Sequence, residues 1–275
     1  PADAPVALLE RDFAAAMGTR YALAVSSCSA ALFLSLRALG LPDFQAYRRL
    51  IETQDGEERR ELISAITTNV TSFFREPAHF DAVTAMIPDF VARARQGDRI
   101  RIWSAGCSSG EEPYSIAMTL REAWPDIDTA DVRILATDID AEMVAKARRG
   151  IYPRPQAGQP MPPLLQRHAR PDGADTFAIA PELKTLVRFA ELNLLGPWPF
   201  NGMFDVIFCR NVVIYFDAAT RQDLWRRFAE RLHPGGTLFV GHSERVDAGL
   251  DTVLAPSGVT QYRRCATDAA PHRRS

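Results

Sequence analysis

The chain has 275 residues, which is enough for one full α/β domain and a smaller helical part. Its residues are 47% hydrophobic and 24% charged, a composition that supports a packed core and argues against disorder. The formal net charge of −2 gives no general attraction to nucleic acid or anionic lipid, so we expect no nucleic-acid partner.

Membrane and secretion signals are weak in this sequence. The most apolar run, residues 21–39, is broken by serines and an arginine and is not a span of the ~20 apolar residues that a bilayer requires. We find no basic segment leading into a cleavage site. The cysteines at 28, 107, 209 and 265 form no C-x-x-C pair, which argues against a zinc cluster and is typical of reduced thiols. We therefore expect a cytoplasmic protein without direct membrane insertion and without a metal site.

Helical spacing of apolar residues dominates the first part of the chain. The predicted helices cover residues 6–39 (two helices around a short apolar segment), 43–54, 57–68 and 78–96. Pro77 suits the first turn of the last of these helices. We assign residues 1–96 to an N-terminal helical domain.

After Gly97 the pattern changes to strands that alternate with helices. The predicted strands cover residues 99–104, 132–137, 186–190, 204–209 and 237–242, and the helices cover 113–124, 142–149 and 219–232. Such alternation predicts an α/β fold with a doubly wound, mostly parallel sheet and helices on both faces. We assign residues 97–265 to this domain, with a small β-subdomain at about 151–185 and a tail at 266–275.

The loop after the first predicted strand is rich in small residues. In a doubly wound sheet, ligands bind beyond the carboxyl ends of the strands. Gly106 and Gly110 would let the backbone approach a ligand closely, but the loop lacks the G-x-G-x-x-G pattern. An ordinary tight turn between strand and helix explains these glycines equally well.

Acidic residues near this loop favour a cationic nucleoside as the ligand. Glu111 and Glu112 open the next helix, where an anionic pair suits a cation better than a phosphate. S-adenosylmethionine (SAM) carries an ammonium and a sulfonium and no phosphate. Asp138 ends the second strand, where a carboxylate accepts ribose hydroxyls in dinucleotide-binding folds. Asp138 could instead cap the following helix, although Asp140 stands closer to it.

Five ordered motifs give the chain a specific resemblance. They are TTNVTSFFRE (67–76), IWSAGCSSGEEPYSIA (102–117), ATDID (136–140), FDVIFCRNVVIYF (204–216) and LHPGGTLFVGHSE (232–244). In order and spacing these motifs resemble those of the CheR family, SAM-dependent methyltransferases that form glutamate methyl esters on chemotaxis receptors. The resemblance covers roughly residues 41–263. It implies a Rossmann-like methyltransferase sheet, SAM as cofactor and the cytoplasmic helices of chemoreceptors as partners.

The same resemblance implies roles for individual residues. Asp138 would hold the ribose, Glu111 the cationic methionine portion, and Asn193 and Leu194 the adenine. The remaining cofactor contacts would come from Asn69, Thr71, Arg75, Arg210 and Asn211. Arg75, Arg210 and Tyr215 are the candidates for positioning the substrate carboxylate. We assign no general base, because a glutamate is already ionised at neutral pH.

The first forty residues depart from this family pattern. They resemble the N-terminal part of DegT-type aminotransferases, which use pyridoxal phosphate, and the two patterns meet near residues 36–41. We interpret the join as a fusion, a recombined or mis-assembled reading frame, or a designed chimera. Lys146 and Lys184 have no matching context for an aldimine, so we expect no aminotransferase activity. Arg37, Arg48 and Arg49 are what remains of a basic face for an acidic receptor.

Two other functions are compatible with the sequence. The chain could be a SAM-binding regulatory or scaffold protein with impaired catalysis, in which case SAM binds without methyl transfer. It could also be a thiol hydrolase that uses Cys107 or Cys209 with His242. No sequence signature supports such a Cys–His pair.

Overall fold

A computed structural model of the chain describes residues 40–53, 56–155 and 160–266, with Leu9, Arg11, Asp12, Ala14 and Ala15. The chain divides into two compact units, Pro1–Leu62 and Ile63–Ser275. The predicted helices at 43–54 and 57–68 correspond to α3 (Phe44–Thr53) and α4 (Glu57–Ile66). The pattern predicted over residues 6–39 and most of the tail lie outside the described residues.

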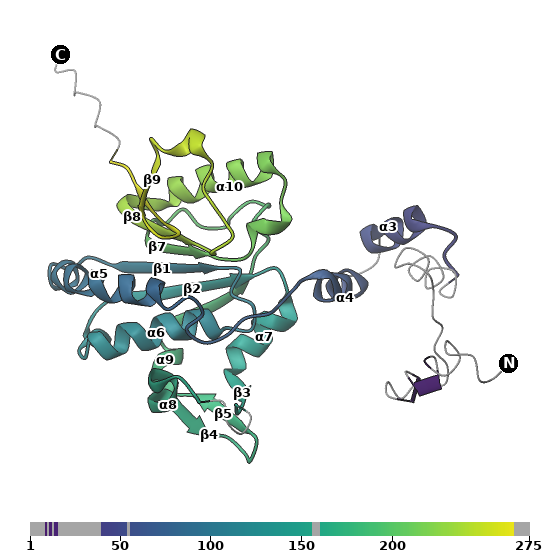
Figure 1. Cartoon of the computed structure of the whole chain (residues 1–275), viewed down its shortest axis with the longest axis horizontal. Helices are drawn as coiled ribbons and strands as arrows, with labels where there is room; N and C mark the ends of the chain where they lie inside the picture. The colour runs from purple at the N-terminus through teal and green to yellow at the C-terminus, as the bar shows by residue number, and fades with distance from the viewer. Residues whose placement is uncertain are drawn as a thin grey trace. The chain divides into compact units, whose positions relative to one another are not determined.

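The second unit is built around a seven-stranded sheet with the order β6-β2-β1-β7-β8-β10-β9 (Figure 1). Its strands are β1 (Ile100–Ala105), β2 (Val132–Asp138), β6 (Val187–Glu191), β7 (Phe204–Cys209), β8 (Leu232–Val240), β9 (Leu254–Gly258) and β10 (Gln261–Arg264). The first five pair in parallel, and β10 is antiparallel to both of its neighbours. All six residues of β7 are buried, as expected for a central strand covered on both faces. The predicted fold class is confirmed.

Helices cover both faces of the sheet (Figure 1). They are α5 (Ala78–Arg95), α6 (Glu111–Ala123), α7 (Ala141–Arg149) and α10 (Ala218–Arg231). Side chains of β1 alternate between the two cores, because successive residues of a strand point to opposite faces. Ile102 packs in the cluster that contains the α5 and α6 residues, and Trp103 packs in the cluster of α10. Across the described ranges, no helix is long and apolar enough to cross a membrane.

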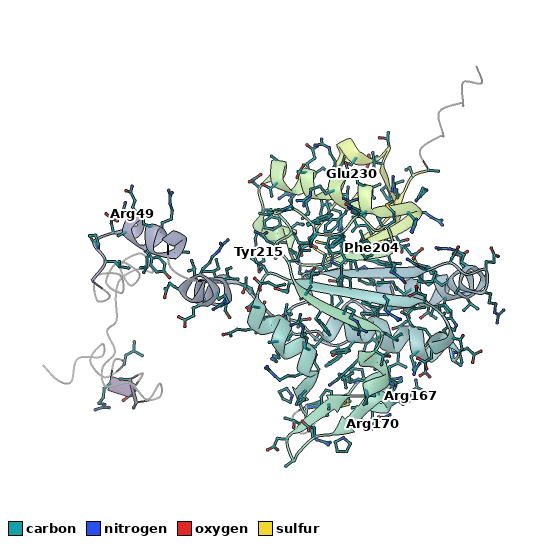
Figure 2. The ribbon with its side chains drawn as sticks, turned by 180° about the vertical axis from the view of Figure 1, so that it is seen from behind. Arg49, Arg167, Arg170, Phe204, Tyr215 and Glu230 are labelled. Atoms are coloured by element: carbon teal, nitrogen blue, oxygen red, sulfur yellow. The ribbon has the colours of Figure 1, made fainter. Side chains whose placement is uncertain are left out.

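A small β-subdomain lies between α7 and β6. Its elements are β3 (Ile151–Pro153), α8 (Pro163–His168), β4 (Ala169–Pro171), β5 (Thr176–Ile179) and α9 (Pro181–Lys184). The three strands form a separate antiparallel sheet in the order β3-β5-β4. Arg167 and Arg170 extend from this subdomain (Figure 2). The proposed border at residues 96–97 falls inside the second compact unit, where α5 packs against α6, and that division stays a prediction.

A buried histidine lies on α5. His79 is 3% exposed, and its Nε2 lies 2.7 Å from Thr260 Oγ1. Its ring packs against Phe239, with 4.8 Å between the ring centroids. Burial, together with the nearby Arg210 cation, lowers the pKa of His79 to about 4, although the Glu76 carboxylate opposes the shift.

This depressed pKa predicts a loss of stability in mild acid. As the pH falls, this histidine is protonated at a higher pH in the unfolded chain than in the folded chain. Stability is therefore lost from about pH 6.5 toward the folded-state pKa. We expect His79 to lower the free energy of unfolding by about 2 kcal/mol between about pH 7 and about pH 5. Denaturant unfolding at both pH values should show a smaller decrease for His79→Gln than for the native chain. Equal decreases would contradict the prediction.

Candidate active site

The carboxyl ends of β1 and β2 meet at one edge of the sheet, because the two strands pair in parallel through Ala105 and Thr137. The loop after β1 contains Gly106 and Gly110, with φ of 87° and 98°. A Cβ at Gly110 would lie 2.8 Å from the Ala147 side chain, so both conformation and packing require glycine there. The loop therefore turns tightly and leads directly into α6.

Asp138 ends β2 and joins this loop to the next turn. Its carboxylate accepts hydrogen bonds from the Ser108 backbone N–H at 2.7 Å and from the Asp140 N–H at 3.0 Å. Its side chain is buried, and this burial raises the pKa of Asp138. Asp140 is the residue that caps α7, since its carboxylate accepts from the N–H groups of Glu142 and Met143. This capping role for Asp140 was predicted and is confirmed.

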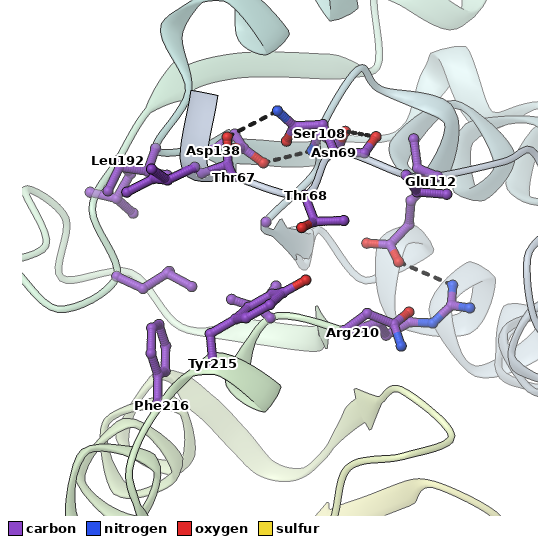
Figure 3. A pocket seen from close by; sticks show the side chains of 18 of the residues that line it. Thr67, Thr68, Asn69, Ser108, Glu112, Asp138, Leu192, Arg210, Tyr215 and Phe216 are labelled. Atoms are coloured by element: carbon purple, nitrogen blue, oxygen red, sulfur yellow. Dashed lines mark hydrogen bonds and ion pairs between the residues drawn. The ribbon is translucent and has the colours of Figure 1, made fainter. Parts of the chain in front are cut away.

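A pocket of about 410 Å³ opens at this edge of the sheet. Asp138 and Tyr215 lie on opposite walls, and the Glu112 carboxylate points into the space between them (Figure 3). The pocket has a size typical of small-molecule sites. Residues named for the site in the sequence analysis line it: Asn69, Thr71, Arg75, Asp138, Asn193, Leu194, Arg210, Asn211 and Tyr215.

Glu111 is the exception among the predicted residues. It does not line the pocket, and its carboxylate accepts a hydrogen bond from Ser109 Oγ at 2.7 Å. The neighbouring Glu112 lines the pocket instead, and its carboxylate accepts from Ser104 Oγ at 2.7 Å. One residue along an α-helix changes the direction of a side chain by about 100°. The choice between two adjacent acids therefore depended on the rotation of α6 about its axis, which the sequence does not give.

The Arg210 guanidinium is held by protein groups. Its side chain is 3% exposed, and it lies 3.0 Å from the Glu112 carboxylate and 3.4 Å from that of Glu76. It also donates to the Arg75 carbonyl. Burial raises the pKa of Glu112, and Arg210 opposes that shift. Arg210 therefore fixes Glu112 in the pocket wall.

The Asn69 side chain also has a structural partner. Its amide nitrogen donates to Asp140 Oδ2 at 2.9 Å and to Thr67 Oγ1 at 3.0 Å. Arg75 donates from Nη1 to the Val70 carbonyl at 3.1 Å. These contacts fold residues 67–76 along the pocket. Gly106 and Glu112, which the sequence analysis placed at the ligand loop, also line the pocket. The remaining lining residues were not predicted: Ile66, Thr67, Thr68, Val70, Ser72, Ser108, Ile139, Leu192, Leu195, Val212 and Phe216.

The geometry opposes thiol chemistry. Cys107 and Cys209 are buried, and burial raises the pKa of both thiols well above the usual range. A reactive cysteine needs the opposite shift. His242 is largely exposed and pairs with Glu76, with 3.3 Å between Nδ1 and Oε1. Within the part of the chain that the structure describes, no three His, Cys, Asp or Glu side chains gather as a metal-binding group.

Comparison with known proteins identifies the family. The family described as "CheR methyltransferase, SAM binding domain" matches residues 69–263, which contain almost the whole pocket. The chain belongs to the CheR methyltransferase family. The Escherichia coli "Chemotaxis protein methyltransferase" is 46% identical over 82% of this chain and 78% of that protein. A "Probable chemotaxis protein methyltransferase" of Rhizobium etli is 44% identical over 83% of this chain and 87% of its own length.

Two further matches are weaker or shorter. A SAM-dependent methyltransferase structure from Mesorhizobium loti is 19% identical, with a TM-score of 0.30 over 58% of this chain and 54% of that one. The DegT/DnrJ/EryC1/StrS aminotransferase family matches residues 4–47, the segment that resembled it in sequence. This short match does not support a chimera. Most of that segment lies outside the described residues.

As a member of the CheR family, the chain is a SAM-dependent methyltransferase, and the pocket suits that cofactor. Two carboxylates line the pocket: that of Asp138, which is buried, and that of Glu112, whose side chain is 12% exposed, and both suit a ligand with ribose hydroxyls and positive charge. Leu192, Leu194 and Ile139 provide apolar contacts for a base. Carboxylates and apolar contacts together match a nucleoside with a cationic tail.

Proposed function

We propose that this chain transfers the methyl group of SAM to glutamate side chains of chemoreceptor proteins, forming methyl esters, and that the receptor presents these glutamates on its cytoplasmic helices. The observation that carries the proposal is the pocket at the carboxyl edge of the sheet, where Asp138 and Glu112 face the same space. The names of the relatives, chemotaxis protein methyltransferases, support the choice of substrate.

In this proposal, different pocket residues contact different parts of the cofactor. Asp138 accepts the ribose hydroxyls, and Glu112 faces the cationic methionine portion. Asn193 and Leu194 flank the base. Asn69, Thr71, Arg75 and Asn211 lie around the remainder of the ligand. When bound, SAM supplies a methyl group activated by the sulfonium.

The protein mainly has to align the reactants and exclude water. The substrate carboxylate is ionised at neutral pH, so no residue has to remove a proton. Charge is neutralised as the oxygen attacks, and water would stabilise the separated charges and slow the reaction. Tyr215, 61% exposed beyond the end of β7 (Figure 2), and Arg75 position the incoming carboxylate.

A methyl-transfer assay tests the proposal. The purified chain is incubated with SAM labelled in its methyl group and with receptor-containing membranes. We expect label on the receptor that mild base releases as methanol, as a methyl ester requires. Base-stable label would contradict ester formation, and SAM binding without any transfer would favour the regulatory or scaffold alternative.

The N-terminal segment is expected to affect receptor recognition and not cofactor binding. Every residue that lines the pocket lies between Ile66 and Phe216. Replacing residues 1–40 with a typical family N-terminus should leave the affinity for S-adenosylhomocysteine (SAH) nearly unchanged. It should raise receptor methylation most at low salt, because charge steering is screened by salt. A change in SAH affinity of about tenfold or more, about 1.4 kcal/mol, would contradict this division.

A further inference from the structure

Glu244 makes an unusual set of backbone contacts behind the pocket. It is 3% exposed and follows the end of β8. Its Oε1 accepts hydrogen bonds from the N–H groups of Val212 and Val213, each at 2.9 Å. Its Oε2 accepts from the N–H of Asn211 at 2.8 Å and from that of Gly241 at 2.6 Å. One carboxylate thus satisfies four backbone donors from two separate segments.

These segments belong to neighbouring parallel strands. Cys209 at the end of β7 is paired with Val240 at the end of β8, so the chain leaves both strands side by side. Asn211 has a φ of 60°, a left-handed conformation that costs energy for a residue other than glycine. The Glu244 carboxylate accepts from this residue and from the two that follow it, and holds the turn in place.

The turn carries four residues of the pocket: Arg210, Asn211, Val212 and Tyr215. Glu244 itself does not line the pocket. We infer that Glu244 is a positioning residue for methyl transfer, which sets the conformation of residues 210–215 and thereby the shape of the SAM pocket. The inference rests on the proposed function, because it concerns the same site.

Glu244→Gln is the direct test, because glutamine keeps the size but presents an NH₂ group where one oxygen stood. Two of the four donors then face another donor. Asp205→Asn is the matched control: Asp205 is a buried carboxylate at the opposite end of β7, and its Oδ2 accepts from the Arg101 N–H at 2.7 Å. Both variants should lower the melting temperature.

SAH binding and SAM kinetics separate positioning from general stability. We expect Glu244→Gln to weaken SAH binding at least tenfold and to raise the KM for SAM, whereas Asp205→Asn stays within twofold of the native chain for both. A folded Glu244→Gln variant with native SAH affinity would overturn the inference, as would equal losses in both variants. A native chain that binds no SAH would instead refute the proposed function.

A second variant decides the question if Glu244→Gln does not fold. A Cβ at Gly241 would lie 2.8 Å from Glu244 Oε2 and 2.6 Å from Asn211 Nδ2. Gly241→Ala therefore displaces the carboxylate and the Asn211 side chain without removing either. We expect at least a tenfold loss of SAH affinity in this variant, and a loss below twofold would overturn the inference.

Discussion

Replacing Asp138 with alanine should weaken SAH binding by about 100-fold or more. The proposed role gives this carboxylate two charge-assisted hydrogen bonds to the ribose, worth roughly 1.5–3 kcal/mol each. The structure adds a second consequence, because the same carboxylate accepts from the N–H groups of Ser108 and Asp140. Part of the loss will therefore come from relaxation of the glycine loop.

Calorimetric titration with SAH, beside denaturant unfolding, measures both effects. Asp138→Asn keeps the shape and one acceptor oxygen. The SAH affinity of this variant should therefore fall between that of the native chain and that of the alanine variant. Asp217→Ala is the control, since Asp217 caps α10 through the Thr220 N–H at 2.9 Å and does not line the pocket. Native SAH affinity in a folded Asp138→Ala variant would mean that this residue serves only the loop.

Neutralising Glu112 should weaken SAM binding by roughly 10- to 100-fold, which corresponds to about 1.5–3 kcal/mol. The Glu112 carboxylate is the acidic group of α6 that lines the pocket, and Arg210 holds it there at 3.0 Å. SAM carries a sulfonium and an ammonium, whereas SAH carries only the ammonium. The loss for Glu112→Gln should therefore be larger for SAM than for SAH.

The adjacent glutamate provides the matched control. Glu111 precedes Glu112 in α6 and is buried, but its carboxylate is bonded to Ser109 and lies away from the pocket. Glu111→Gln should bind both ligands within about twofold of the native chain. Equal losses in the two variants, or a larger loss for Glu111→Gln, would reverse the assignment.

Much of the fold was predictable because the signals are local. Apolar runs such as FDVIFC and helical spacing placed the central strands and helices close to their observed bounds. The β9–β10 hairpin was missed: β9 includes Pro256 and is mostly exposed, so it lacks the apolar pattern of a strand. β8 begins at Leu232, five residues before the predicted start of this strand. The strand includes the predicted HPGG turn, and its pairing with β7 shifts register there.

The site was predictable where the sequence pattern fixes a residue at a strand end, as at Asp138. It was not predictable where tertiary packing decides the outcome. Glu112 lines the pocket and Glu111 does not, because of the rotation of α6. The contacts of Arg210 with Glu76 and of Glu244 with residues 211–213 join segments that are far apart in the sequence. No spacing rule would have paired them.

A crystal structure of the chain with SAH tests the central claim most directly. We predict the nucleoside at the carboxyl edge of the sheet, with its ribose hydroxyls on Asp138 and its methionine end beside Glu112. A second cavity of about 720 Å³, lined by residues that include Arg93, Asp205 and His233, lies by the start of β7. SAH bound in that cavity, or at the first pocket without contact to Asp138, would contradict the account.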